Sequence, residues 1–301
     1  MSGSKPQPVF SSDVAAGVLR EACALIGEQH DDAELLRLGE NAIFRLAGAP
    51  VVVRIARDMD RWADATKEVA VSSWLESSGV AAAQTWQVAQ PIEVHGHPVT
   101  FWQNIDGRRG ANRDVRELAT VLRRLHSLPQ PTDFSLESVS PIERVQRRIE
   151  LAAVDDDDKA YLRRLAATLR SHLDELVFPL AACVTHGDAH VQNLMIVDGD
   201  PVLIDFERFG FGQPEWDLSV TATEYVTAKF WSAAEYTAFV DEYGFDVTDW
   251  AGFGVLRRIQ ELKMTTWLMQ NVDEKPSIRA EFDRRMTVIR EGRPSLAWHA
   301  F

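Results

Sequence analysis

The chain contains little cysteine, no apolar run long enough to span a membrane and no repeated segment. Only two of its 301 residues are cysteines, Cys23 and Cys183. Their spacing matches no metal-binding pattern, so we expect two buried free thiols in a reducing cytosol. Apolar runs are interrupted well before the ~18 residues that a membrane-spanning helix needs. The N-terminus lacks the apolar core of a signal peptide. These absences predict a cytoplasmic protein that does not cross a membrane.

Basic residues are also scarce relative to acidic ones. Lys and Arg number 32 against 45 Asp and Glu, which gives a formal net charge of −13. Such a surface repels nucleic acid and anionic membranes and favours a cationic partner if the acids gather near a cleft, although solubility alone would also account for it. The hydrophobic content of 46% is ordinary for a globular protein, and 301 residues suffice for two lobes. The sequence does not indicate an oligomeric state.

The segment from Cys183 to Leu218 is the most informative part of the chain. Three polar residues, Asp188, Asn193 and Asp205, stand among apolar, strand-like runs. An Asp followed five residues later by Asn, and then by an Asp that closes an apolar run, is the spacing of kinase-type phosphoryl-transfer sites. In such sites the first Asp accepts the hydroxyl proton and the other two residues hold magnesium. Turn capping by ordinary loop residues is the alternative, and it does not account for the whole pattern.

A β-hairpin is expected to carry the two metal-binding side chains. Two apolar runs flank the turn Asp-Gly-Asp at 198–200, which is a strong short-range hairpin signal. Strands are therefore predicted at 194–197 and 202–206. This arrangement would bring Asn193 and Asp205 near one end of one hairpin. Magnesium takes only one or two protein oxygen ligands when substrate phosphates supply others, so one Asn and one Asp are enough.

These residues carry a resemblance to a known family. The sequence His-Gly-Asp-Ala-His-Val-Gln-Asn at 186–193, then Ile-Asp-Phe-Glu at 204–207 and Pro-Glu-Trp-Asp-Leu at 214–218, resembles the aminoglycoside phosphotransferase family. This family has the protein-kinase-like fold and includes kinases of antibiotics, choline and homoserine. Its catalytic loop usually reads H-G-D-x-H-x-x-N, and every fixed position matches. The resemblance covers most of the chain, from about Leu35 to the last helices.

The resemblance implies an α+β, bilobal protein-kinase-like fold. We expect a small antiparallel sheet cradling one helix at 1–104, with a leading helix, as the nucleotide-binding lobe. A larger, mainly helical lobe at 105–301 would carry catalysis and substrate binding. Apolar periodicity predicts the elements of the first lobe. They are helices at 13–28 and 60–77 and strands at 34–38, 43–47, 51–56, 84–94 and 98–105.

The resemblance also implies roles for individual residues. Asp188 would be the catalytic residue, Asn193 and Asp205 the magnesium ligands, and ATP the phosphoryl donor. Asp217 would brace the catalytic loop, a role compatible with a second one as an acid in the first turn of a helix. His186 is expected to orient the loop backbone and not to act as a base.

Weaker signals predict the nucleotide site. Gly39 and Asn41 resemble the family's turn over the phosphates, and because the segment has a single glycine, an ordinary hairpin turn is the less favoured alternative. Arg54 stands where kinases carry the strand cation that contacts the nucleotide phosphates, and Glu68 is its expected partner. A surface ion pair is the alternative for these two residues. The main chain at Gln103 and Ile105 would meet the base.

We interpret the sequence as an ATP- and Mg²⁺-dependent kinase that phosphorylates a hydroxyl of an aminoglycoside or another cationic antibiotic. A kinase of an amino alcohol or amino sugar is the alternative with the same chemistry, and a non-catalytic nucleotide-binding pseudokinase is the alternative without turnover. The combination of Asp188, Asn193 and Asp205 argues against the pseudokinase. Five acids are candidates for the acceptor site, with a solvated helix acid as the favoured alternative for any single one: Glu207, Glu215, Glu224, Glu261 and Asp273.

Overall fold

A computed structural model describes residues 10–39 and 41–300, so Glu40, the middle residue of the predicted phosphate turn, lies outside the described residues. The chain divides into two compact units, which we describe separately. The first comprises 1–108 and 195–207, and the second 109–194 and 208–301. The assignment of nucleotide binding to 1–104 and of substrate binding to 105–301 stays a prediction.

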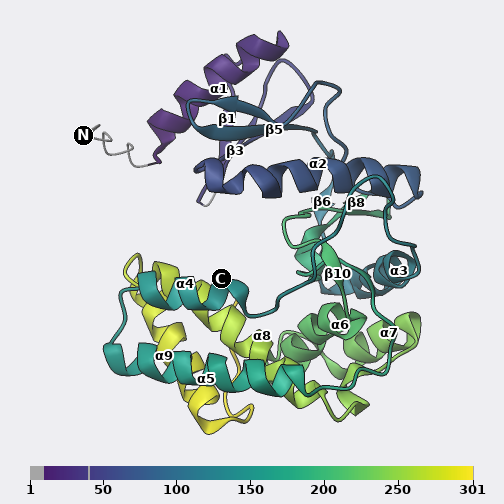
Figure 1. Ribbon diagram of the computed structural model, residues 1–301, viewed down its shortest axis with the longest axis vertical. Coiled ribbons are helices and arrows are strands. Elements are labelled where there is room, and N and C mark those ends of the chain that lie inside the picture. Colours follow the sequence, from purple (N-terminus) through teal and green to yellow (C-terminus); the bar gives the residue numbers. More distant parts are fainter. Residues whose placement is uncertain (1–9, 40, 301) are drawn as a thin grey trace. The chain divides into compact units, whose positions relative to one another are not determined.

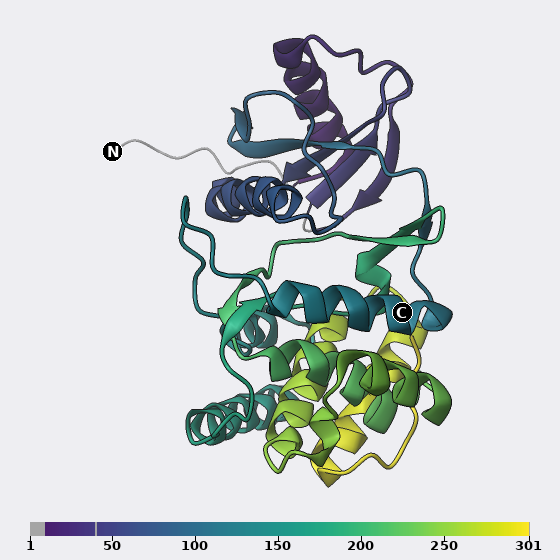
Figure 2. The ribbon, with the colours of Figure 1, turned by 90° about the vertical axis from the view of Figure 1, so that its right-hand side faces the viewer.

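The first unit is built on a five-stranded sheet in the order β1-β2-β3-β5-β4, in which all neighbouring strands are antiparallel. The strands are β1 (Glu34–Leu38), β2 (Asn41–Arg45), β3 (Val51–Ala56), β4 (Ile92–Val94) and β5 (His97–Gln103). Two helices cover this sheet, α1 (Ser12–Ile26) and α2 (Trp62–Ser77), the latter preceded by a 3-10 turn, η1 (Met59–Arg61). Figures 1 and 2 show α1 and α2 on opposite sides of the sheet.

The alternation of β3 explains why both faces are covered. Val51, Val53 and Ile55 are fully buried in one apolar cluster with residues of α1. Successive side chains of a strand point to opposite faces, so Arg54 faces the other helix, α2. There it pairs with Glu68. The position of the proposed nucleotide cation therefore follows from the period of the strand.

The predicted strand at 84–94 is wrong over most of its length, because only Ile92–Val94 is a strand. The side chain of Gln90 takes the place of a strand backbone beside Phe101. Its Oε1 accepts from the Phe101 amide at 2.7 Å, and its Nε2 donates to the Phe101 carbonyl at 3.1 Å. The backbone amide and carbonyl of Phe101 in β5 thus have hydrogen-bond partners although no regular strand pairs with β5 at this point on the side of Gln90.

The hairpin after the catalytic loop forms, but its second strand is displaced from the predicted range. Strand β8 (Leu194–Val197) is followed by β9 (Asp200–Leu203), within a sheet of order β6-β8-β9 whose third strand is β6 (Arg108–Arg109). Asp198 and Gly199 both have positive φ, 52° and 98°, as the two-residue turn requires. Strand pairing ends before 206 because Asp205 has φ 68°, which is incompatible with an extended strand.

The second unit is mainly helical. Its helices are α3 (Val115–His126), α4 (Glu143–Leu151), α5 (Asp156–Asp174), α6 (Pro214–Thr223), α7 (Ala233–Tyr243), α8 (Phe253–Leu268) and α9 (Pro276–Glu291). A π-helix, η4 (Glu224–Ala228), continues α6, and four 3-10 turns, η2 (Asn112–Asp114), η3 (Val191–Asn193), η5 (Val247–Asp249) and η6 (Met269–Asn271), complete the unit. Two short strands, β7 (Cys183–Thr185) and β10 (Gly210–Gly212), pair antiparallel. No helix within residues 10–39 and 41–300 has the length and apolar character needed to cross a membrane.

Candidate active site

The catalytic loop leaves strand β7 through a tight turn at Gly187. This residue has φ 79°, a conformation that glycine adopts without strain. A Cβ atom built there would lie 2.2 Å from the carbonyl oxygen of Arg208, the residue two positions before β10. Both the backbone conformation and the close approach of a neighbouring chain therefore require glycine between His186 and Asp188.

Asp188 and Asn193 are joined by a direct contact within this loop. The Nδ2 of Asn193 donates to the carbonyl oxygen of Asp188 at 2.9 Å, and the amide of His190 donates to the same oxygen at 3.0 Å. The amide of Asp188 donates to Nδ1 of His186 at 3.3 Å, which agrees with the predicted orienting role of that imidazole. The side chain of Asp188 remains one-third exposed, whereas Asn193 is buried. The loop thus fixes the backbone and leaves the carboxylate accessible.

Asp217 braces the loop from the first turn of α6, as predicted. Its Oδ2 accepts from the amide of His186 at 2.7 Å and its Oδ1 from the amide of Gly187 at 2.8 Å. The carboxylate is fully buried, and Nε2 of His126 lies 3.0 Å from Oδ2. His126 ends α3 and contacts the hydroxyl of Tyr243 through its other ring nitrogen, at 2.8 Å. A buried chain of polar contacts therefore anchors the loop to three helices.

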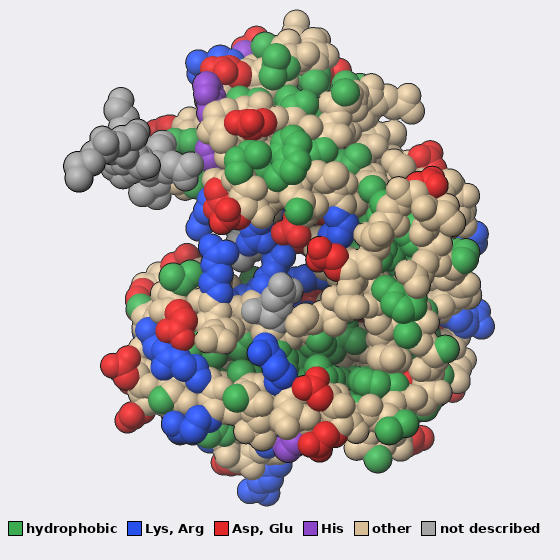
Figure 3. All heavy atoms as spheres, viewed as in Figure 1, with side chains coloured by type: hydrophobic (Ala, Val, Ile, Leu, Met, Phe, Trp, Pro, Cys, Tyr) green, Lys and Arg blue, Asp and Glu red, His purple; other side chains and the backbone are tan. Residues whose placement is uncertain are grey.

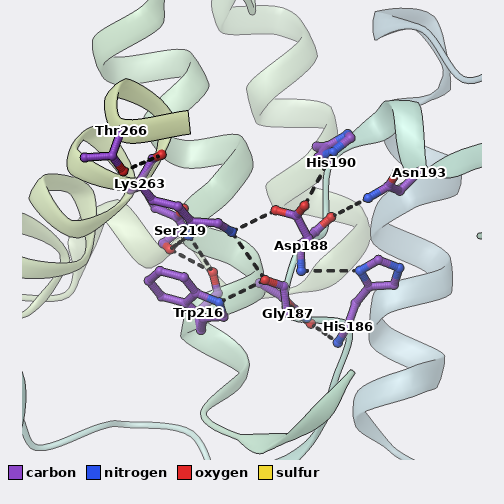
Figure 4. A network of polar contacts seen from close by, with 11 residues as sticks. His186, Gly187, Asp188, His190, Asn193, Trp216, Ser219, Lys263 and Thr266 are labelled. Atoms are coloured by element: carbon purple, nitrogen blue, oxygen red, sulfur yellow. Dashed lines mark hydrogen bonds and ion pairs between the residues drawn. The ribbon is translucent and has the colours of Figure 1, made fainter. Parts of the chain in front are cut away.

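Lys263 of α8 forms an ion pair with Asp188 that sequence analysis did not predict. Its Nζ lies 2.7 Å from Oδ1 of Asp188 and 3.4 Å from the carbonyl oxygen of Gly187 (Figure 4). Burial alone would raise the pKa of Asp188, but the charges of Lys263, His190 and Arg208 outweigh it and hold that pKa well below its usual range. Asp188 is therefore ionised at neutral pH.

Asp205 follows strand β9 with its side chain exposed. Its φ of 68° lies in the left-handed region, which is uncommon for a residue other than glycine. Asn193, in the other unit, donates a hydrogen bond from Nδ2 to the carbonyl oxygen of Asp188, which leaves its Oδ1 as an acceptor. An exposed carboxylate and an amide oxygen are the hard donors that magnesium prefers, so both residues fit the predicted ion. Within the described part of the chain, no group of three or more His, Cys, Asp or Glu residues is arranged to hold a metal.

Arg54 lies at the centre of a cluster of carboxylates in the first unit. Glu68 of α2 forms a charge-assisted hydrogen bond with Nη1, and Oε2 of Glu207 lies 3.3 Å from Nη2. The side chains of Arg54 and Glu68 are only 18% and 5% exposed, which rules out the surface-pair interpretation. Lys67 is committed elsewhere, donating from Nζ to the carbonyl of Glu207 at 2.8 Å. Arg54 is therefore a mostly buried cation of strand β3 whose charge is paired within this unit.

Burial and charge oppose each other in this cluster. Burial disfavours the charge of Arg54, but the carboxylates of Glu68, Asp205 and Glu207 raise its pKa above the ordinary value. Burial raises the pKa of Glu68, with further contributions from Asp205 and Glu207, although Arg54 opposes the shift. The guanidinium is thus permanently charged, and the carboxylates around it carry excess negative charge. An anionic ligand that binds here would have to displace a carboxylate from Arg54 or bind together with a cation.

The remaining predicted nucleotide-site residues also lie in the first unit. The carbonyl of Gly39 accepts from Nη2 of Arg57 at 3.0 Å. When the side-chain amide of Asn41 is oriented with Oδ1 toward the guanidinium of Arg54, this oxygen accepts hydrogen bonds from Nη2 at 2.8 Å and from Nε at 3.1 Å. The amide of Gln103 donates to the carbonyl of Gln84, so it is occupied. Ile105 lies after β5 and is half-buried. Asn41 therefore joins the Arg54 cluster, a contact that its place in the turn did not predict.

Four of the five acids proposed for the acceptor site are committed to other contacts. Glu207 pairs with Arg54 and Arg61. Glu215 is buried and accepts from the amide of Leu180. Glu261 is buried and paired with Arg257, and Asp273 forms an exposed pair with Arg279. These four acids thus already have partners within the protein.

Glu224 is the fifth candidate and differs from the others. It is half-buried, begins the π-helix η4, and accepts from Nε1 of Trp231 at 2.9 Å through Oε2. Burial raises its pKa to about 7, the bond from Trp231 opposes this, and the negative charge of Asp188 adds to it. π-helices are frequent at functional sites. Glu224 is thus a carboxylate in the electrostatic range of Asp188 with no cationic partner among the described residues.

Two residues of the site were missed by sequence analysis. His126 contacts Asp217 across 91 positions of sequence. Lys263 contacts Asp188 across 75 positions. A single His or Lys in a helical pattern carries no information about a partner so distant. The sequence indicated these contacts only indirectly, because a fixed loop needs buried hydrogen-bond partners from other segments.

Comparison with known proteins places this geometry in context. A family model described as the phosphotransferase enzyme family matches residues 34–256. The aminoglycoside 3'-phosphotransferase of Escherichia coli is 31% identical over 170 residues, which make up 52% of this chain. The match spans 62% of that relative's length.

Solved structures extend the similarity to the whole chain. The structure of amicoumacin kinase hAmiN in complex with AMP-PNP, Ca²⁺ and Ami has a TM-score of 0.72 and 15% identity, with 96% of this chain and 98% of that chain covered. The microcompartment-associated aminopropanol kinase has a TM-score of 0.64 and 17% identity, with 94% and 95% covered. At these identities the similarity concerns the fold, and it confirms the predicted kinase-like α+β architecture.

Proposed function

Because the chain belongs to the phosphotransferase enzyme family, we propose that it transfers the γ-phosphoryl group of ATP to a hydroxyl of a small molecule. The braced catalytic loop is the observation that carries this proposal. Asn193 holds the main chain of Asp188, and Asp217 holds the two residues before it. The carboxylate of Asp188 is thereby accessible on a rigid backbone. A pseudokinase would need no such proton acceptor, so we favour turnover.

Asp188 would act on the acceptor hydroxyl. Lys263 engages its Oδ1, so Oδ2 is the oxygen left for a substrate. As the hydroxyl oxygen bonds to the γ-phosphorus, the bond from that phosphorus to the β–γ bridging oxygen breaks, ADP leaves, and the hydroxyl proton passes to Asp188. Because the transition state of phosphoryl transfer is loose, orientation contributes more than base strength. The lowered pKa of Asp188 suits this role, since it keeps the carboxylate ionised.

The remaining groups would bind and orient the donor. Asn193 and Asp205 would hold magnesium, which neutralises charge on the phosphates when it is bound. Arg54, fixed by Glu68, would contact the α- and β-phosphates, and Gly39 and Asn41 would lie over them. The main chain at Gln103 and Ile105 would meet the base, and the Ile105 amide would be the donor because no acceptor for it lies among the described residues.

We further propose that the acceptor carries an amine. Acidic and basic side chains are interspersed on the face shown in Figure 3, so the net charge of −13 does not form a single acidic field there. Selectivity for a cation would instead come from Glu224, whose Oε1 is uncommitted within the described residues. An aminoglycoside or another cationic antibiotic is the first candidate, in line with the similarity to the E. coli enzyme. An amino alcohol is the second, in line with the similarity to aminopropanol kinase.

A coupled ADP-release screen tests this function. The panel contains aminoglycosides, other cationic antibiotics, amino alcohols, amino sugars and deaminated analogues, each with Mg-ATP or Mg-GTP. We expect release to depend on one class of amine-bearing acceptor, with the phosphorylated product identified by mass spectrometry. The Asp188→Asn variant gives the background. If no acceptor raises release above that background, phosphoryl transfer to small molecules is the wrong function.

A further inference from the structure

Lys263 has the contacts of a built component of the catalytic centre. Its ammonium lies between Oδ1 of Asp188, at 2.7 Å, and the carbonyl oxygen of Gly187, at 3.4 Å, and its side chain is only 12% exposed. The Nζ also lies 5.3 Å from the centre of the Trp216 ring, within cation–π range. Ammonium groups are rarely buried unless they are paired. This lysine is therefore held in one place by three groups.

The three groups belong to the catalytic loop and to the helix that braces it. Nε1 of Trp216 donates to the carbonyl of Gly187 at 3.2 Å, so that carbonyl accepts from both the indole and the ammonium. Trp216 directly precedes Asp217, the residue that fixes the loop amides. Figure 4 shows Lys263 reaching from α8 toward Gly187 and Asp188. The loop is thus clamped by Asp217 at its amides and by Lys263 at its carbonyl and carboxylate.

Lys263 lies beyond the segment that matches the family model, which ends at residue 256. Its contacts also split the functions of the two carboxylate oxygens of Asp188. Oδ1 is engaged by Lys263, whereas Oδ2 has no hydrogen-bond partner among residues 10–39 and 41–300 and lies 4.0 Å from Nε2 of His190. Holding one oxygen fixes the rotation of the carboxylate and aims the other at the acceptor position.

We propose that Lys263 is a positioning residue for phosphoryl transfer, which orients the carboxylate of Asp188 toward the acceptor hydroxyl. This proposal rests on the proposed function, because it assigns Lys263 a role through Asp188. It requires a positive charge at the end of the side chain, not only volume. It also requires that Lys263 acts on turnover and not on the binding of the nucleotide, since its contacts are with the catalytic loop.

Substitution at position 263 tests the need for charge. In Lys263→Met we expect kcat to fall on the order of 10²-fold, as for a small misplacement of a reacting group, with the KM for ATP unchanged. Lys263→Arg should recover part of kcat, and methylammonium should rescue Lys263→Ala in a concentration-dependent manner. Lys275→Met, at an exposed lysine of the same unit, is the control and should behave as wild type. Equal loss in the Met and Arg variants without amine rescue would overturn the proposal.

A double-variant experiment separates action through Asp188 from a general structural effect. If Lys263 acts by orienting that carboxylate, Lys263→Met should cause no further loss in an Asp188→Asn background. Independent, multiplicative losses would contradict the proposed role. Thermal unfolding of each variant identifies any that fail to fold, and Lys263→Arg then serves for the comparison.

A third measurement does not depend on activity, so it distinguishes failure of this inference from failure of the proposed function. Reductive methylation followed by peptide mass spectrometry reports the reactivity of each lysine. We expect Lys263 to be protected relative to Lys275 in the wild type, because it is buried and held by Asp188. It should become reactive in Asp188→Asn, which removes the charge that retains the ammonium. Reactivity of Lys263 equal to that of Lys275 in the wild type would overturn the proposal whether or not an acceptor is found.

Discussion

The side-chain amide of Asn193 donates a hydrogen bond to the backbone carbonyl of Asp188, across 2.9 Å and five positions of sequence. The amide of His190 donates to the same oxygen, so the loop closes on itself within a few residues. This contact orients Asn193 with its nitrogen inward and leaves its oxygen for another ligand. One short segment thereby fixes both a proposed proton acceptor and a proposed metal ligand.

Replacing Asp188 by Asn should strongly reduce phosphoryl transfer while nucleotide binding is retained. The variant preserves the shape of the side chain and the backbone contacts of the loop, but it removes the proton acceptor. General-base assistance accounts for ~10²–10⁴ in rate, and we expect a loss of kcat in this range. Steady-state kinetics on the identified acceptor and calorimetry with Mg-ATP measure the two effects. Asp200→Asn, at an exposed position of the hairpin, is the control, and wild-type turnover of Asp188→Asn would refute the assignment.

The proposed metal ligands should differ in their importance. Asp205→Ala removes an anionic ligand, so we expect Mg-ATP binding to weaken strongly and activity to be lost. Asn193→Ala removes a neutral ligand and should weaken binding less, although it also releases the carbonyl of Asp188. Calorimetric titration of Mg-ATP compares both variants with Asp200→Ala. Unchanged affinity and activity in Asp205→Ala would remove this residue from the metal site.

Glu68 should matter through Arg54. In Glu68→Gln the guanidinium keeps Glu207 and Asn41 as partners but loses its closest charged one. We expect the KM for ATP to rise about tenfold, equivalent to ~1.4 kcal/mol, with a smaller effect on the KM of the acceptor. Glu76→Gln, at an exposed position of the same helix, is the matched control. A larger effect on the acceptor than on ATP would contradict the assignment of Arg54 to the nucleotide.

Local patterns predicted the parts of this molecule that depend on near neighbours in sequence. The match at 186–193 identified the family, which the match at 34–256 confirms, and the turn at 198–200 produced the expected hairpin. Strand β3 occupies the predicted range because its alternation and apolar content agree. Three aspartates fill the first turn of helix α5, where negative charge is favourable near the helix N-terminus.

Contacts between distant segments could not be predicted in the same way. The second strand of the hairpin ends early because Leu203 bonds to the carbonyl of Ala81, and Asp205 then turns into the left-handed region. The segment at 84–91 replaces a ladder by the side chain of Gln90. Lys263 reaches Asp188 from a helix whose sequence shows only amphipathic periodicity. In each case the structure depends on a partner far away in sequence. The local residue pattern of a segment does not identify such a partner.

Asp217 should be the residue of the site on which stability depends most. Its buried carboxylate accepts from two loop amides and contacts His126. In Asp217→Ala these donors lose their partner without access to water, at ~1–3 kcal/mol for each. We expect a reduction in the free energy of unfolding of about 2–5 kcal/mol in urea titrations, together with loss of activity. Asp273→Ala, at an exposed acid paired with Arg279, should change stability by less than ~0.5 kcal/mol. Similar stability of the two variants would show that the loop does not depend on this brace.

Glu224 should confer a pH dependence on the binding of a cationic acceptor. Its pKa in the folded protein is raised from 4.5 to about 7. The carboxylate therefore becomes charged as the pH rises through about 7, and the KM of an amine-bearing acceptor should fall over this interval. In Glu224→Gln this fall should disappear, whereas a deaminated analogue should show none in either protein. A KM that falls equally in wild type and variant would assign the effect to the substrate or to another group.

The same titration has the opposite effect on stability, and this gives a second test of the pKa of Glu224. Between pH 4.5 and about 7 the folded protein retains a proton that the unfolded chain has lost. The contribution of Glu224 to stability is therefore fully present below 4.5 and is lost as the pH rises to about 7. Glu224→Gln should gain stability relative to the wild type across this window and reach a constant difference above it, as measured by urea unfolding at each pH. A difference that does not vary with pH would mean that Glu224 titrates normally, and the carboxylate would then be charged throughout the range in which the acceptor binds.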